Sequence, residues 1–314
     1  STTGPTGSYS NVGSTGTNGI GADETGAWVT PYFLHKTDPT KMFAGYENVF
    51  RCDNIRATTS ASVAWTAIST GETTTCIALE QSPANVDIIY VVRSGAVKRT
   101  DNANAVAGSV VWTNCALPGG LTPTDVKAHP TDANIVYATA GYKVYRSANK
   151  GTSWTDISSN LPALFTNCLV LDKHANEGIY VGNQTGIWYK NATMTNWALY
   201  STELPPVDIR ELEIYYDAVA ANSRIKAATY GRGLWQSDLA EINVIDPTNF
   251  AANDASSSQI DLAWTNDADN DKVMIAWSPT TSFSVPANGT AYTAGSTLPS
   301  GKGTVCYVGN LTSF

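Results

Sequence analysis

Stretches that alternate with period two, such as Thr75–Leu79 and Asn167–Leu171, recur along the first 240 positions, and this period is typical of β-strands. Each is followed by a second β-rich run, such as Ile89–Val92 or Val136–Thr139. About ten residues after each such run comes an apolar couplet, which begins at positions 49, 97, 144, 187 and 234, in steps of 48, 47, 43 and 47 residues. A tryptophan follows in four of these units, at Trp65, Trp112, Trp154 and Trp197. The pattern predicts four short strands per repeat.

A repeat of this length with four strands is typical of a β-propeller blade. We therefore predict an all-β chain, with five visible repeats of a propeller of four-stranded blades over residues 26–243. Residues 1–25 are rich in Gly, Ser and Thr. They are either a long loop that enters the first visible blade, with earlier blades upstream, or a flexible linker.

The last seventy residues follow a different pattern. The runs Ser258–Thr265 and Lys272–Ser278 each alternate with period two, and an acidic turn, Asn266–Asp271, joins them. They resemble two strands of a fibronectin type III domain, an immunoglobulin-like β-sandwich of about 100 residues. Residues 244–314 are thus expected to form a partial sandwich that acts as a spacer.

One repeat contains a sharper motif, with Ser147, Asn149, Gly151 and Trp154 at fixed spacing. It matches the pattern S-x-[D/N]-x-G-x-x-W of the Asp-box, a turn between the third and fourth strands of some propeller blades. The amide of Asn149 can bond to nearby main chain, and Gly151 can adopt a positive φ. We interpret the motif as structural.

With these residues the chain resembles the Asp-box (BNR) propellers, which include sortilin-like domains, sialidases and xyloglucanase-like glycosidases. It is most similar to sortilin-like repeats of large secreted Bacteroidota proteins, through Gly26–Pro31, Phe43–Val49 and Ala227–Trp235. The resemblance implies an extracellular or cell-surface bacterial protein, and implies export by the type IX secretion system.

Composition excludes some functions. Only 15% of the residues are charged, and the net charge of −8 argues against nucleic acid and anionic membranes as partners. No apolar run approaches the ~18 residues of a membrane span. The five cysteines have no metal-ligand spacing, and no metal or cofactor is expected.

Other chemical groups have ordinary explanations. The histidines His35, His129 and His174 occupy one register in three repeats, so a ring would keep them apart and disfavour a catalytic triad. Asp267, Asp269 and Asp271 alternate like a calcium loop but lack its glycine and glutamate, which favours a solvated turn. Four glycosylation sequons occur at about the frequency expected by chance: Asn183, Asn191, Asn288 and Asn310.

The loops between second and third strands form the usual ligand face of a propeller. The candidates for ligand binding in these loops are Tyr46, Glu47, Arg93, Tyr142, Tyr230 and Arg232. Aromatic, acidic and arginine side chains together suit a glycan or an extracellular protein. No residue is assigned a catalytic role.

Three functions remain open. The favoured one is a non-catalytic binding or scaffold module. A second is a fragment of an extracellular glycoside hydrolase, with carboxylates drawn from Glu47, Glu72 and Glu203. A third is a passive cargo protein whose partners are components of its secretion system.

Overall fold

The computed structural model describes residues 11–175, 177–201, 203–217, 222–240, 248–256, 259–266, 272–280, 282–284, 286 and 292–313. The chain divides into two compact units. One comprises residues 1–213 with Lys226–Trp235, and the other comprises Ile214–Ile225 with Gln236–Phe314. The boundary predicted at residue 243 lies outside the described residues.

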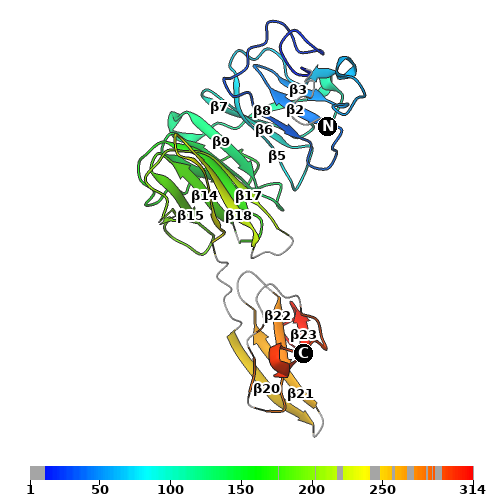
Figure 1. The fold of residues 1–314 in the computed structure, drawn as a ribbon, viewed down its shortest axis with the longest axis vertical. Helices are drawn as coiled ribbons and strands as arrows, with labels where there is room; N and C mark the ends of the chain where they lie inside the picture. Colours follow the sequence, from blue (N-terminus) through cyan, green and yellow to red (C-terminus); the bar gives the residue numbers. More distant parts are fainter. Residues whose placement is uncertain are drawn as a thin grey trace. The chain divides into compact units, whose positions relative to one another are not determined.

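The first unit contains four consecutive four-stranded antiparallel sheets, each with its strands in chain order (Figure 1). Blade 1 consists of β1 (Tyr32–Leu34), β2 (Met42–Gly45), β3 (Val49–Cys52) and β4 (Trp65–Ala67). Blade 2 consists of β5 (Cys76–Gln81), β6 (Ile89–Arg93), β7 (Ala96–Thr100) and β8 (Trp112–Asn114). Blade 3 consists of β9 (Pro123–Ala128), β10 (Val136–Ala140), β11 (Lys143–Ser147) and β12 (Thr155–Asp156). Blade 4 consists of β13 (Thr166–Asp172), β14 (Gly178–Asn183), β15 (Gly186–Lys190) and β16 (Ala198–Leu199).

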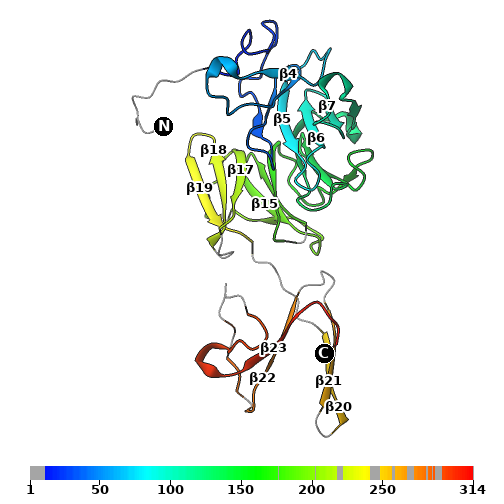
Figure 2. The same cartoon turned by 90° about the vertical axis from the view of Figure 1, so that its right-hand side faces the viewer.

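A fifth sheet follows, with described strands β17 (Ile209–Tyr215), β18 (Arg224–Thr229) and β19 (Gly233–Asp238) (Figure 2). Its residues are shared between the two compact units. Helix in the described part of the chain is of the 3-10 type, as in the turns Ser60–Ser62, Ala107–Ser109, Pro118–Gly120 and Pro299–Gly301. The predicted all-β propeller fold is confirmed.

Apolar side chains form the core between successive blades. The layer between blades 1 and 2 includes Phe43, Ile68 and Val91, and the layer between blades 3 and 4 includes Leu169 and Trp197. A β-strand presents alternate residues to its two faces, so each sheet contributes to the layers on both sides. This packing explains why both faces of the second strands are apolar.

Residues 11–24 pack against the outer face of blade 1. The main-chain carbonyl of Val12 accepts a hydrogen bond of 2.5 Å from Trp65 Nε1, and Asn18 Nδ2 donates to the carbonyls of Ser60 and Val63. In blade 2, Trp112 makes the corresponding bond to the preceding blade, at the Ile68 carbonyl. The N-terminal segment thus covers the face that a preceding blade covers elsewhere.

The second unit contains two antiparallel pairs, β20 (Thr248–Ser256) with β21 (Gln259–Thr265) and β22 (Val273–Trp277) with β23 (Thr304–Gly309). The runs predicted as strands, Ser258–Thr265 and Lys272–Ser278, coincide with β21 and β22. Trp264 and Val305 are buried there. The fibronectin-like sandwich stays a prediction.

Candidate functional site

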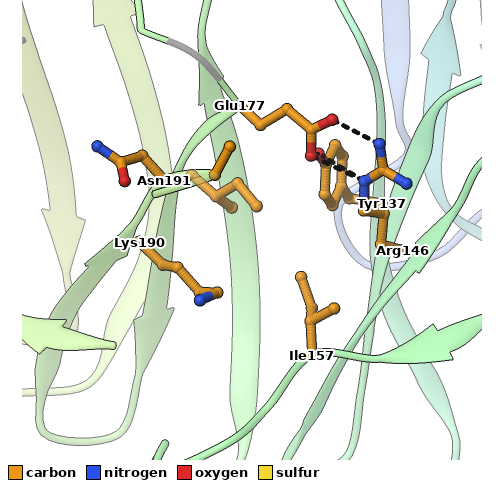
Figure 3. Close-up of a pocket in the computed structure, with 8 residues that line it drawn as sticks. Tyr137, Arg146, Ile157, Glu177, Lys190 and Asn191 are labelled. Carbon is orange, nitrogen blue, oxygen red and sulfur yellow. Dashed lines mark hydrogen bonds and ion pairs between the residues drawn. The ribbon is translucent and has the colours of Figure 1, made fainter. Parts of the chain in front are cut away.

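A cavity of about 200 Å³ lies between blades 3 and 4 (Figure 3). Its lining consists of Tyr137, Arg146, Ile157, Glu177, Ile179, Lys190, Asn191 and Ala192. These residues come from the ends of β10, β11, β14 and β15 and from the connections beside them. The cavity therefore lies on the side of the first-to-second and third-to-fourth strand connections, opposite the face predicted to bind ligands.

One wall of the cavity is a hydrogen-bonded cluster of three side chains. Arg146 Nε donates to Glu177 Oε2 at 2.8 Å, and Arg146 Nη2 donates to Oε1 of the same carboxylate (Figure 3). The hydroxyl of Tyr137 also donates to Glu177 Oε2. Both oxygens of Glu177 thus accept hydrogen bonds, whereas Arg146 Nη1 makes no bond to the described residues.

Lys190 lies on the other side of the cavity, at the end of β15 (Figure 3). Its ammonium donates to the main-chain carbonyl of Met194, and it forms no ion pair with the described residues. Burial lowers the pKa of Lys190. An ammonium keeps two further N–H groups after one hydrogen bond, so Lys190 adds donors to the cavity.

The hydrogen bonds of Glu177 and Arg146 determine the charge states of these two side chains. Burial alone would raise the pKa of Glu177, but hydrogen bonds from Arg146 and Tyr137 outweigh it, and the net shift is downward. The pKa of Arg146 is raised, chiefly by its hydrogen bonds to Glu177. Burial and the bond to Glu177 raise the pKa of Tyr137. Glu177 and Arg146 are therefore both charged, and Tyr137 is neutral, at physiological pH.

The other blade boundaries explain why a cavity exists here. Arg51, Arg99 and Arg146 occupy the same register position in β3, β7 and β11, paired with Phe43, Tyr90 and Tyr137. Arg51 Nη1 donates to the main-chain carbonyl of Ala103 in blade 2 at 2.7 Å. Arg99 Nη1 donates to the carbonyl of Lys150 in blade 3. Arg146 bonds instead to the carboxylate of Glu177 in blade 4. The space beside the turn that follows β15 therefore stays open.

A single position in the repeat accounts for this difference. Two residues after each arginine the sequence has Asp53, Asp101 and Ala148. Arg51 Nε bonds to Asp53 at 3.0 Å and Arg99 Nε bonds to Asp101 at 2.9 Å. Because Ala148 has no carboxylate, Arg146 takes its anionic partner from the next blade. Sequence reasoning missed this site, although the loss of the aspartate was a usable signal.

Two of the predicted ligand-binding residues are buried. Arg93 is 1% exposed and donates through Nη1 to the carbonyls of Glu47 and Thr74, while its Nε lies 3.7 Å from Glu72. Tyr46 is 7% exposed and its hydroxyl donates to the Gly13 carbonyl. Both side chains hold loops together and are not available at the surface, because the loops fold back onto them.

The other predicted ligand-binding residues are accessible. Tyr142 and Tyr230 are exposed, Arg232 is exposed, and Glu47 is partly exposed. Arg210 stacks over the Tyr230 ring, 5.1 Å from its centroid. Their role in ligand binding stays a prediction.

The predicted Asp-box residues form a compact turn. Asn149 Oδ1 accepts from the Ser147 hydroxyl and the Ser153 main-chain N–H, both at 2.9 Å. Gly151 has a φ of +81° and donates its N–H to Ser147 Oγ. Trp154 is half-buried and packs on the core layer between blades 2 and 3. Its Nε1 is buried and makes no hydrogen bond to the described residues.

Two of the three histidines, His35 and His129, cap the connections between first and second strands. His35 Nδ1 accepts from the N–H groups of Thr37 and Asp38, and His129 Nδ1 accepts from those of Thr131 and Asp132. This bonding needs the neutral imidazole. Burial lowers the pKa of both rings.

The described residues contain no group of three His, Cys, Asp or Glu side chains placed to hold a metal ion. The alternating aspartates Asp267, Asp269 and Asp271 lie outside the described residues, as does the sequon at Asn288. In the described part of the chain no helix is long and apolar enough to span a membrane.

No protein-family model matches the sequence, and no curated protein matches it. Solved structures are similar to it in fold. An ancestral GH74 enzyme is similar with a TM-score of 0.55 and 13% identity, over 85% of this chain and 43% of that chain. A GH74 xyloglucanase from Xanthomonas campestris has a TM-score of 0.50 and 15% identity, over 78% and 44%. A GH74 enzyme from Niastella koreensis has a TM-score of 0.50 and 16% identity, over 66% and 29%.

At these identities the similarity shows the fold alone. It agrees with the succession of antiparallel four-stranded sheets. The chain is a β-propeller. This propeller chain spans less than half the length of each of those GH74 enzymes.

Proposed function

We propose that this propeller is a non-catalytic binding module whose ligand enters the cavity between blades 3 and 4. The observation that supports this is a preformed cavity lined by an ammonium that has no anionic partner among the described residues. Lys190 retains two N–H groups after its bond to the Met194 carbonyl, whereas Glu177 already accepts bonds at both oxygens. Preformed concave sites with a few fixed polar groups are typical of ligand binding.

The same contacts argue against hydrolysis at this site. A glycoside hydrolase needs two carboxyl groups about 5–9.5 Å apart, one of which acts as an acid with a raised pKa. The cavity lining contains one carboxylate, Glu177, whose pKa is lowered. Glu72, one of the predicted catalytic candidates, pairs instead with Lys98 at 2.7 Å.

We also propose a ligand class, a family and a cellular location for this chain. We take the ligand to be a glycan, or else an extracellular protein. The Ser147–Trp154 turn supports membership of the Asp-box propellers, and with it a secreted or cell-surface protein of Bacteroidota exported by the type IX system. The C-terminal unit would act as a spacer. A glycoside hydrolase fragment is the second candidate, which similarity in fold to the GH74 enzymes favours. A passive cargo protein is the third.

The test is a glycan and peptide array probed with the wild-type protein and with Lys190→Met, together with hydrolysis assays on the same ligands. We expect binding that Lys190→Met weakens, without release of reducing ends. Turnover that Glu47→Gln or Glu203→Gln abolishes would overturn the proposal in favour of the glycosidase.

A further inference from the structure

We propose that the cavity between blades 3 and 4 recognises the carboxylate of an acidic glycan, a chain of hexuronic acid residues. This inference rests on the proposed function and specifies the ligand. It follows from the charge, the donors and the size of the cavity.

The charge of the cavity favours an anion. Arg146, Lys190 and Glu177 line it, and their formal charges sum to +1. The Glu177 carboxylate is neutralised in place by Arg146, which leaves Lys190 without an anionic partner among the described residues. A monoanionic group beside Lys190 would complete the charge balance of a half-buried site, where an ion pair is stronger than at an exposed surface.

The free donors suit a carboxylate. The ammonium of Lys190 retains two N–H groups after its bond to the Met194 carbonyl, whereas Arg146 turns Nε and Nη2 to Glu177 and its third nitrogen points away from Lys190 (Figure 3). A carboxylate accepts such donors through both oxygens, and charge-assisted bonds of this kind are among the strongest in proteins. A cationic ligand would instead need acceptors, and both oxygens of Glu177 already accept hydrogen bonds from Arg146 or Tyr137.

The size and walls of the cavity favour a sugar ring over an acidic amino-acid side chain. Its volume of about 200 Å³ is far larger than the roughly 10–15 Å³ that a cavity needs to hold one water. Ile157 and Ile179 supply an apolar wall for the C–H face of a ring. A sugar acid thus suits the site, with its carboxylate toward Lys190.

The whole chain carries a net charge of −8, so its overall field does not attract an acidic ligand. Affinity would have to come from the contacts inside the cavity. Removal of one of those contacts should therefore weaken the affinity for the ligand strongly.

Isothermal titration with trigalacturonate and with its methyl ester tests this directly, because the ester keeps the rings and loses the charge. We expect esterification and Lys190→Met each to weaken binding at least about tenfold. Lys143→Gln is the matched control. Lys143 lies at the opposite end of β11 from Arg146 and pairs with Asp156, so this change should leave affinity unchanged.

Glu177→Gln should strengthen the binding of trigalacturonate, whereas Lys190→Met should weaken it. It raises the formal charge of the cavity to +2 while an amide oxygen can still accept from Arg146, so trigalacturonate should bind a few-fold more tightly. A purely structural role for Glu177 predicts weaker binding instead, which makes the sign of the change decisive.

Three outcomes would overturn the inference in different ways. Equal binding of acid and ester would exclude carboxylate recognition but leave a glycan-binding module. Lys190-dependent binding of a neutral oligosaccharide or of an acidic peptide, with no binding of trigalacturonate, triglucuronate or trimannuronate, would overturn the hexuronate ligand alone. No Lys190-dependent binding of any of these probes would overturn both this inference and the proposed function.

Discussion

Arg146 of blade 3 and Glu177 of blade 4 form a two-pronged ion pair across a blade boundary. At the two preceding boundaries the equivalent arginines, Arg51 and Arg99, bond to main-chain carbonyls of the next blade. Arg146 bonds to a side-chain carboxylate where Arg51 and Arg99 bond to main-chain carbonyls. This difference leaves room for a cavity between blades 3 and 4.

Loss of the carboxylate should destabilise the fold. We expect Glu177→Ala to cost about 1–2 kcal/mol of unfolding free energy, because Arg146 and Tyr137 lose their shared acceptor while the pair is still partly solvated. Chemical denaturation measures it. Asp101→Ala is the comparison, expected within about 0.5 kcal/mol of wild type, since Arg99 keeps the Lys150 carbonyl. Equal costs for the two changes would contradict the ion-pair argument.

The inter-blade tryptophans should differ in their tolerance of phenylalanine. Trp197 is 2% exposed and its Nε1 donates to the Ile157 carbonyl at 2.8 Å, whereas Nε1 of the half-buried Trp154 makes no bond. Trp197→Phe should therefore cost about 1–2 kcal/mol more than Trp154→Phe. Urea unfolding of the two variants checks this order, and the reverse order would show that the indole bond contributes nothing.

Gly151 should not accept a β-branched residue. Its φ is +81°, and an added Cβ would lie 3.0 Å from the Cys115 side chain. Gly151→Val should thus cost about 1–3 kcal/mol. Gly95→Val serves as a control for φ alone, because Gly95 also has a positive φ of 83° but has open space around its Cβ. A smaller loss of stability at Gly151 than at Gly95 would contradict the packing argument.

Stability should fall in mild acid because of His35 and His129. Burial lowers their folded pKa values below the ordinary histidine value of 6.5, so below about pH 6.5 the unfolded chain takes up protons that the folded chain binds less readily. The histidine contribution is therefore complete above this pH and is lost as the pH falls through 6.5 toward the lowered pKa values. Unfolding free energies from pH 5 to 8 measure it. The double variant His35→Asn/His129→Asn should have a shallower slope, and an unchanged slope would refute the assignment.

The repeat made the fold predictable. Runs such as Ile179–Gly182 and couplets such as Val144-Tyr145 recur at the spacing of a blade, and they became β14 and part of β11. Local pattern is sufficient there because a four-stranded blade is formed from consecutive residues.

The site was not predictable in the same way. Arg146 and Glu177 are 31 residues apart and meet only because successive blades stack. Loop positions alone also placed Tyr46 and Arg93 on a ligand face, although both side chains turn inward to bond main-chain carbonyls. Side-chain direction depends on packing between blades, which the strand pattern does not contain.

The most direct measurement is a crystal structure of the protein with trigalacturonate. We predict a sugar carboxylate within about 2.7–3.2 Å of Lys190 Nζ, with its ring against Ile157 and Ile179. A trisaccharide bound instead at the opposite face, over Tyr142, Tyr230 or Arg232, would contradict the account and restore the loops between second and third strands as the ligand site.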